Sequence, residues 1–197
     1  MLFGCALAVA CSAAAKGGRN REKVGDWRAL LSSQDRARLR NWRESWIKAV
    51  ADARQHGAAG QIAGEGALLD PDAANGSDAP PPGAYRCRTV KVGSLGPNGI
   101  PFVANPWLSC RIDGGHFATL SGSQRPIGDL HRDDAGRLVF VGAIALGDEQ
   151  GAFAYGRDDE RDMVGIVEQI GPRRWRMVIP QPRWESQLDV TEIVPAG

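Results

Sequence analysis

The sequence predicts a mainly β protein of the α+β class, in which an N-terminal amphipathic helix packs on an antiparallel, barrel-like sheet of about eight strands. Three observations predict this fold. Glycine (25) and proline (12) are frequent among the 197 residues, which favours turns and short strands over a helical bundle. Apolar residues recur at three- and four-residue steps between residues 39 and 50, and from Ala84 onward they alternate with a period of two.

The composition limits the classes of function. Hydrophobic residues make up 43% of the chain, which is enough to bury a core. The 24 Lys and Arg residues nearly balance the 23 Asp and Glu residues, and a net charge of +1 excludes a nucleic-acid binder that relies on bulk charge. No run of about twenty apolar residues is present, so no membrane-spanning helix is predicted.

Residues 1–26 are expected to be a processing signal and a tether. An apolar run ends in Ala8-Val9-Ala10 directly before Cys11, and small residues before a cysteine resemble a bacterial lipobox. In such a signal the cysteine is lipidated and becomes the first residue of the mature protein, so we expect a lipid anchor on Cys11. The alternatives are a plain secretory signal cleaved near residues 13–15 and a cytosolic N-terminus.

Residues 27–83 are expected to hold the N-terminal helix and a connector. Ser32 or Ser33 is a suitable helix cap, and Asp35 lies in the first turn. The apolar stripe of this helix comprises Leu39, Trp42, Trp46 and Val50, with Ile47 beside it. Gly57 is expected to end the helix. The glycine-rich connector has one helical turn near residues 65–69 and leads through prolines 80–82 into the sheet.

Residues 84–197 are expected to form the antiparallel β domain. Strands are predicted around residues 85–90, 108–112, 117–121, 126–131, 138–146, 164–170, 175–179 and 188–194, and Phe153 and Tyr155 extend the alternation. Turns at Gly114-Gly115, at residues 133–136 and at Gly171-Pro172 are short, which indicates antiparallel neighbours. Residues 138–146 are apolar on both faces, which is typical of a central strand.

Two cysteines remain in the β domain once Cys5 is removed with the signal. Cys87 and Cys110 each point inward on a predicted strand. An exported domain with two such cysteines forms a disulfide, so we expect a Cys87–Cys110 bond, with two buried free thiols as the alternative. The spacing matches no metal site.

Motifs for catalysis are largely missing from the sequence. It contains no nucleophile elbow, phosphate-binding glycine loop or His-Glu-x-x-His. His116 and His131 could approach each other if their strands pair and could bind a metal with Asp113 or Asp129, but two solvent-facing histidines are the simpler interpretation. A triad of a serine, one of these histidines and an aspartate can be drawn and carries little weight. We therefore expect no catalytic residue, cofactor or metal.

A polar run over residues 121–125 is the candidate ligand-binding segment. Ser121, Ser123, Gln124 and Arg125 combine hydroxyl, amide and guanidinium groups without apolar neighbours, and Pro126 limits strand pairing there. We interpret the segment as a recognition site at a barrel mouth that suits a small anionic ligand. The alternative is a structural bulge in which Arg125 pairs internally with an acid such as Asp148 or Glu149.

A second polar run over residues 157–162 contains four carboxylates. Such a group could hold Ca²⁺ through its oxygens. Its arginines, Arg157 and Arg161, oppose a cation and favour a solvated loop or an ion-pair network instead.

The chain resembles a bacterial family known as domain of unknown function 4893, from about Trp27 to Pro195. The resemblance is carried by Tyr85-Arg86-Cys87-Arg88 with Lys91 and Gly93, Ser121 to Pro126 with Gly128, Gly147-Asp148-Glu149, Tyr155-Gly156, Arg161-Asp162 with Gly165, Trp175-Arg176 with Pro180, Glu185-Ser186, Asp189-Val190 and Glu192. Ser121 stands where the family pattern has threonine. The resemblance implies export and the domain limits, and it implies no catalytic residue.

These observations predict an exported bacterial envelope protein that acts as a non-catalytic binding or interaction module and is lipid-anchored in the periplasm or outer membrane. A soluble secreted form is the alternative location. The partner is expected to be an envelope protein or a small anionic ligand, with membrane contact only through the lipid. The alternative functions are a hydrolase or other enzyme with its site near Ser121 to Arg125, and a structural envelope protein.

Overall fold

The structure is a computed structural model that describes residue 1, residues 26–76 and residues 78–197. Cys11, the expected lipidation site, lies outside these residues. None of the helices described is long and apolar enough to cross a lipid bilayer.

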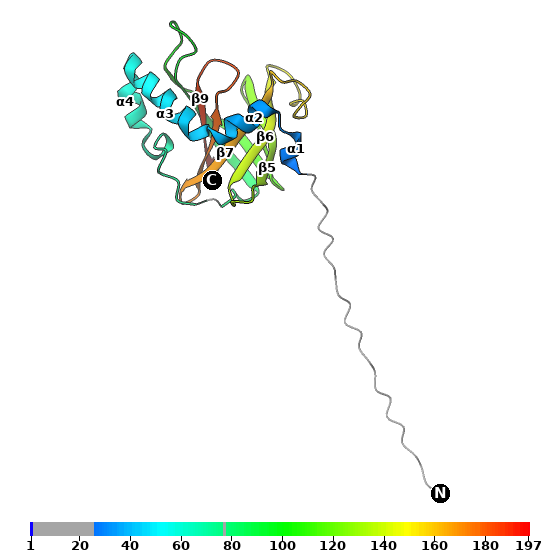
Figure 1. The fold of residues 1–197 in the computed structure, drawn as a ribbon. Helices are drawn as coiled ribbons and strands as arrows, with labels where there is room; N and C mark the ends of the chain where they lie inside the picture. Colours follow the sequence, from blue (N-terminus) through cyan, green and yellow to red (C-terminus); the bar gives the residue numbers. More distant parts are fainter. Residues whose placement is uncertain (2–25, 77) are drawn as a thin grey trace.

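Eight antiparallel strands close into a barrel, and a ninth short strand extends it (Figure 1). The strands are β1 (Gly83–Val92), β2 (Phe102–Ala104), β3 (Leu108–Asp113), β4 (His116–Thr119), β5 (Gln124–Arg132), β6 (Leu138–Leu146), β7 (Asp162–Gly171), β8 (Arg174–Pro180) and β9 (Leu188–Pro195). From β3 to β9 each strand pairs with the next, and β1 closes the barrel by pairing with both β3 and β9.

Strand β2 is the extra strand, and it pairs with β1 along the same edge of β1 as β3 does. The first half of β1, Gly83–Cys87, pairs with β3, and its last residues, Val90–Val92, pair with β2. The alternation did not predict β2, which is only three residues long. The predicted continuation at Phe153 and Tyr155 is wrong, because these residues lie in the irregular connection between β6 and β7.

The prediction of a single N-terminal amphipathic helix is also wrong. Several short helices replace it: α1 (Trp27–Leu30), α2 (Ser33–Arg40), α3 (Trp42–Ala53), the π-helical turn η1 (Arg54–Ala58), α4 (Ala59–Gly64) and the 3₁₀ turn η2 (Gly66–Leu68). Asn41 leaves the helical conformation between α2 and α3, with φ of −101° and ψ of 15°. The expected helix end at Gly57 is confirmed, because Gly57, with φ of 91°, and His56 leave the helical conformation and form a kink before α4. Ser32 is the cap of α2, accepting a hydrogen bond from the Asp35 amide at 3.0 Å.

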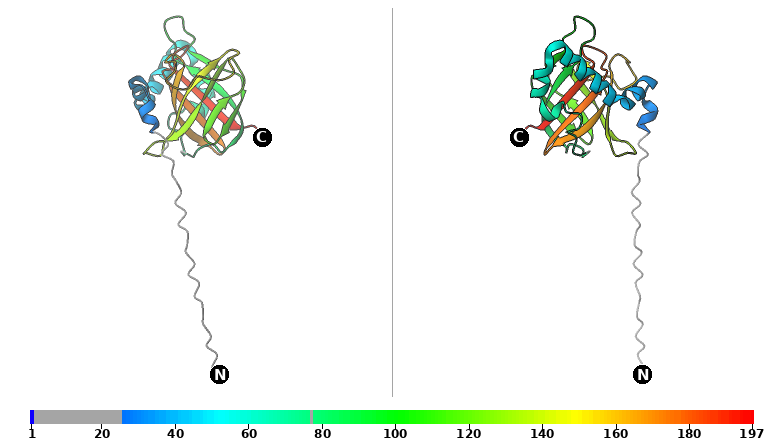
Figure 2. Two further views of the ribbon diagram at one scale, coloured as in Figure 1. Left: turned by 90° about the vertical axis from the view of Figure 1, so that its right-hand side faces the viewer. Right: turned by 60° about the vertical axis from the view of Figure 1, so that its left-hand side comes forward.

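Apolar side chains form one core inside the barrel and two outside it. The interior core includes Tyr85, Phe117, Phe140, Trp175 and Met177. The ring of Phe140 fits over β5 and β6 because Gly128 and Gly142 leave it room, since a Cβ on either glycine would lie within 3 Å of the ring. The helices lie on one side of the barrel and cover its outer face (Figure 2).

The two outer cores contain residues of different helices. Trp46 and Val50 of α3 pack with Leu188 and Val190 of β9. Trp27, Leu31 and Leu39, from α1, α2 and the turn between them, pack with apolar residues of β6 and β7. The helices are therefore held on the barrel by burial of apolar side chains in two separate clusters, and not by one continuous apolar stripe along a single helix.

A disulfide joins Cys87 of β1 to Cys110 of β3, as predicted. Tyr85 is the direct cross-strand partner of Cys110, so the bond runs diagonally between the two strands. Both cysteines belong to the interior core.

We expect the double substitution Cys87→Ala and Cys110→Ala to lower the free energy of unfolding by about 3 kcal/mol, because the bond closes a loop in the unfolded chain. Equilibrium denaturation of the oxidised protein and the variant measures this difference. Two free thiols in the unfolded, unreduced parent protein would contradict the pairing.

Candidate functional site

The candidate site lies at the barrel end that carries the longest connections. The β1–β2 connection (93–101), the β6–β7 connection (147–161) and the β8–β9 connection (181–187) project from one end, whereas the C-terminus lies at the other (Figure 1). At this end the inward-facing residues of β1 and β9 change from apolar to polar. Thr89 and Thr191 share a hydrogen bond of 2.8 Å, and Lys91 and Asp189 are the next inward pair.

Lys91 is the centre of a charged group at this end. Its ammonium lies 3.1 Å from Asp189 Oδ2 and 3.1 Å from Glu185 Oε2. The hydroxyl of Ser186 donates a hydrogen bond to the other oxygen of Asp189. Glu185 has a φ of 71°, which is a strained value for a residue with a side chain. In this backbone conformation its carboxylate contacts Lys91.

Burial and pairing shift the pKa values of this group. Burial would lower the pKa of Lys91, but Asp189 and Glu185 outweigh it, so the pKa lies above its usual value and the side chain stays protonated. Burial raises the pKa of Asp189 despite Lys91 and Ser186, which favour its charged form. Burial would also raise the pKa of Glu185, but contact with Lys91 holds it below the usual range.

An open cleft of about 750 Å³ lies beside this charged group. One wall is polar and includes Lys91, Ser123, Gln124 and Glu185. The other wall, from residues 95–108, is mainly apolar through Leu95, Ile100, Val103, Pro106 and Leu108, and it also carries Asn98 and Asn105. Ile100 is 65% exposed and Leu95 is 52% exposed, so this wall offers apolar surface that the described chain leaves uncovered.

The residues predicted from the polar run separate into two groups. Ser123 and Gln124 line the cleft, and the Gln124 amide donates to Glu185 Oε1 at 3.0 Å. Ser121 accepts a hydrogen bond from the Ser109 amide and so extends the β3–β4 pairing. Arg125 projects outside the barrel and braces the loops that surround the cleft.

Arg125 makes this brace by donating to three backbone carbonyls. Its guanidinium reaches the carbonyls of Gly122 at 2.7 Å, Gly147 at 2.6 Å and Glu149 at 2.5 Å. The expected internal partner of Arg125, the side chain of Glu149, is bound instead by Arg161 at 2.8 Å. Arg125 therefore holds two connections together through backbone oxygens.

Sequence reasoning missed Lys91, Asp189, Glu185 and Trp184. Lys91 and Asp189 are separated by 98 residues, and no local pattern relates them. The period-two alternation of β1 and β9 does place both side chains on the inward face, and a charged residue at an inward position was the available signal.

The other candidate groups occupy separate places. His116 lies opposite Asp129 on paired strands, with Nδ1 2.8 Å from the carboxylate, and His131 stacks on Trp27 with ring centroids 5.6 Å apart. In the acidic run, Arg161 forms an ion pair with Glu149. Within residues 26–76 and 78–197, no three His, Cys, Asp or Glu side chains gather as a metal site.

The chain matches a known protein family. A family model described as domain of unknown function (DUF4893) matches residues 27–193, which covers nearly all of the residues that the structure describes. The chain belongs to the DUF4893 family. No curated protein and no solved structure shows significant similarity to it. In this DUF4893 protein, Lys91, Gln124, Glu185 and Asp189, from sequence segments far apart, meet at one end of the barrel.

The geometry of the charged group suits holding a ligand better than attacking one. Ser186 is 1% exposed and its hydroxyl is used in a hydrogen bond to Asp189, so it is not accessible to a ligand in the cleft. Lys91 is protonated and paired, so it cannot accept a proton near neutral pH. The groups that remain for a ligand are the side chains of Ser123, Gln124, Asn98 and Asn105 and the mainly apolar wall.

We expect Lys91→Met to destabilise the protein by about 3–5 kcal/mol at pH 8, because it leaves the buried Asp189 carboxylate without its cation. The loss should be smaller at pH 5. Without Lys91, the pKa of Asp189 in the folded variant rises further above its value in the unfolded chain. The folded variant therefore binds a proton at a pH where the unfolded chain does not. Its free energy of unfolding falls as pH rises between the unfolded and the folded pKa of Asp189. Denaturation curves at both pH values measure the effect.

A second substitution, Asp189→Asn in the Lys91→Met background, serves as the control. It should recover much of the lost stability at pH 8, since the unpaired charge is removed. Equal losses at pH 5 and pH 8, without recovery by Asp189→Asn, would show that the ion pair is not the cause.

Proposed function

We propose that this DUF4893 protein is an exported, lipid-anchored binding module of the bacterial cell envelope, which holds a small amphiphilic ligand in the cleft at the open end of its barrel. The observation that carries the proposal is the cleft itself, with a polar wall from Lys91 to Gln124 and an exposed apolar wall from Leu95 to Leu108. Its volume of about 750 Å³ falls within the range of about 300–1,000 Å³ for small-molecule sites.

The architecture of the barrel supports a ligand-binding role. An eight-stranded barrel has an interior wide enough for packed side chains or one small ligand. Here aliphatic and aromatic side chains fill the interior core, and the polar end beside Lys91 is where a ligand can enter. Because Asp189 and Glu185 neutralise Lys91, we propose that the ligand places uncharged hydrogen-bonding groups against Ser123 and Gln124 and apolar groups against Ile100.

Two features support the exported, lipid-anchored part of the proposal. The small residues before Cys11 resemble a lipobox. The Cys87–Cys110 disulfide fits an oxidising compartment such as the periplasm.

We expect the protein to bind N-phenyl-1-naphthylamine, a neutral amphiphilic fluorophore, in the cleft. Ser123→Trp should abolish the fluorescence increase because the indole fills the cleft beside Gln124. Ser33→Trp, on the exposed start of α2, is the matched control and should bind like the parent. Equal binding by both variants would place the fluorophore elsewhere and contradict a cleft site.

We expect the mature protein extracted from membranes to begin at Cys11 and to carry covalently attached acyl chains, because one chain alone anchors only marginally. Intact-mass measurement tests this. A mass that matches an unmodified chain cleaved near residues 13–15 would contradict the lipid anchor and leave export in place.

A further inference from the structure

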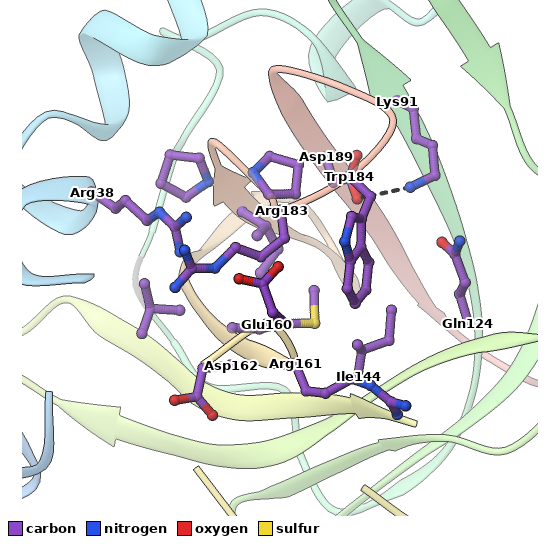
Figure 3. A pocket seen from close by; sticks show the side chains of 15 residues that line it. Arg38, Lys91, Gln124, Ile144, Glu160, Arg161, Asp162, Arg183, Trp184 and Asp189 are labelled. Carbon is purple, nitrogen blue, oxygen red and sulfur yellow. Dashed lines mark hydrogen bonds and ion pairs between the residues drawn. The ribbon is translucent and has the colours of Figure 1, made fainter. Parts of the chain in front are cut away.

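A second, smaller cavity lies next to the cleft, between the barrel end and helix α2 (Figure 3). Its volume is about 30 Å³, and it shares Lys91 and Gln124 with the cleft. Arg38 lines it from α2, and Arg183 and Trp184 line it from the β8–β9 connection.

Two arginines point toward one another across this cavity. Figure 3 shows Arg38 extending from α2 and Arg183 extending from the opposite side. Arg38 donates from Nη1 to Asp35 at 2.8 Å, and Arg183 donates from Nη1 to Gln34 at 3.1 Å. The Nε atom of each arginine is buried and has no hydrogen-bond partner among the residues that the structure describes.

These unpaired donors are unusual enough to need an explanation. The Arg38 side chain is only 8% exposed, so bulk solvent reaches it little. Buried donors of charged groups almost always have an acceptor, because an unpaired one loses its hydration without compensation. Two guanidinium groups that face each other also repel unless a negative group lies between them.

Two buried carboxylates that line the cavity are already engaged by other groups. Asp162, which also lines the cavity, accepts two hydrogen bonds from the Gly156 amide. Asp189 is held by Lys91 and Ser186. The acceptor that would satisfy both Nε atoms is therefore not one of these side chains.

We propose that Arg38 and Arg183 bind a carboxylate group in this cavity. A water-sized group needs about 10–15 Å³ of such space, so a cavity of about 30 Å³ has room for two oxygen atoms. Guanidinium groups pair with carboxylates through short, charge-assisted hydrogen bonds. The carboxylate belongs either to a free small acid or to one end of a larger ligand that also lies in the cleft.

Glu160 provides an independent check on the charge of the site. Its side chain lines the same cavity and is exposed at the residue level, so its carboxylate opposes an incoming anion. Glu160→Gln should therefore strengthen carboxylate binding, whereas Arg183→Gln should weaken it. Opposite effects of two neighbouring substitutions distinguish a binding site from a general loss of structure.

Acetate is the probe, titrated at pH 7 and constant ionic strength while ¹H–¹⁵N spectra record the arginine Nε–Hε groups. We expect the Arg38 and Arg183 resonances to shift along one saturation curve.

Arg183→Gln should weaken acetate binding by about tenfold or more, which corresponds to one charge-assisted hydrogen bond. Glu160→Gln should tighten it by about threefold, as expected when a partly screened like charge is removed. Arg40→Gln, an equal charge loss at an exposed position of α2, should leave it unchanged.

The proposal is overturned if neither Nε–Hε resonance moves with acetate, or if Arg183→Gln and Arg40→Gln bind acetate equally. If Arg183→Gln does not fold, Glu160→Gln decides, and unchanged or weaker binding by that variant overturns the proposal. Octanoate distinguishes the two sources: Ser123→Trp should weaken octanoate but not acetate if the carboxylate belongs to a cleft ligand. The acetate result does not depend on the proposed function, so either can fail alone.

Discussion

The pairing of β1 with β9 is the constraint on which the rest of the structure depends. Eight residue pairs, from Tyr85 with Pro195 to Val92 with Leu188, join the first strand to the last and close the barrel. Closure removes the exposed edges that an open sheet would leave. It also decides which side chains face each other, because a shift of one residue would move every inward side chain to the outer face.

The same register organises charges on both faces of these strands. Outside the barrel, Arg88 lies opposite Glu192, and Glu65 from the segment after α4 completes the ion pairs. Arg176 of β8 donates to backbone carbonyls around η2 and pairs with Glu168. These contacts fasten the helical segment to the barrel in addition to the apolar packing around Trp46. Because both partners of such pairs are partly shielded, they specify position more than they add stability.

Inside the barrel, the β1–β9 pairing places Lys91 opposite Asp189 at the end where the interior becomes polar. The strained turn at Glu185 supplies a second carboxylate, and Gln124 of β5 completes the wall. The candidate site thus consists of a rigid floor formed by two strands and a rim formed by connections. In many proteins a rigid scaffold positions the loops that carry the binding residues.

The sequence by itself determined the features that depend on neighbouring residues. The period of two predicted all eight barrel strands and the inward cysteines, glycine-containing runs predicted the turns, and Ser32 was one of the two predicted caps of α2. Only the tertiary structure decided the break at Asn41, since packing on two different cores favours two helices over one. It also decided the roles of Arg125 and Lys91. The carbonyls that occupy Arg125 and the carboxylates that neutralise Lys91 come from distant segments, and only barrel closure brings them together.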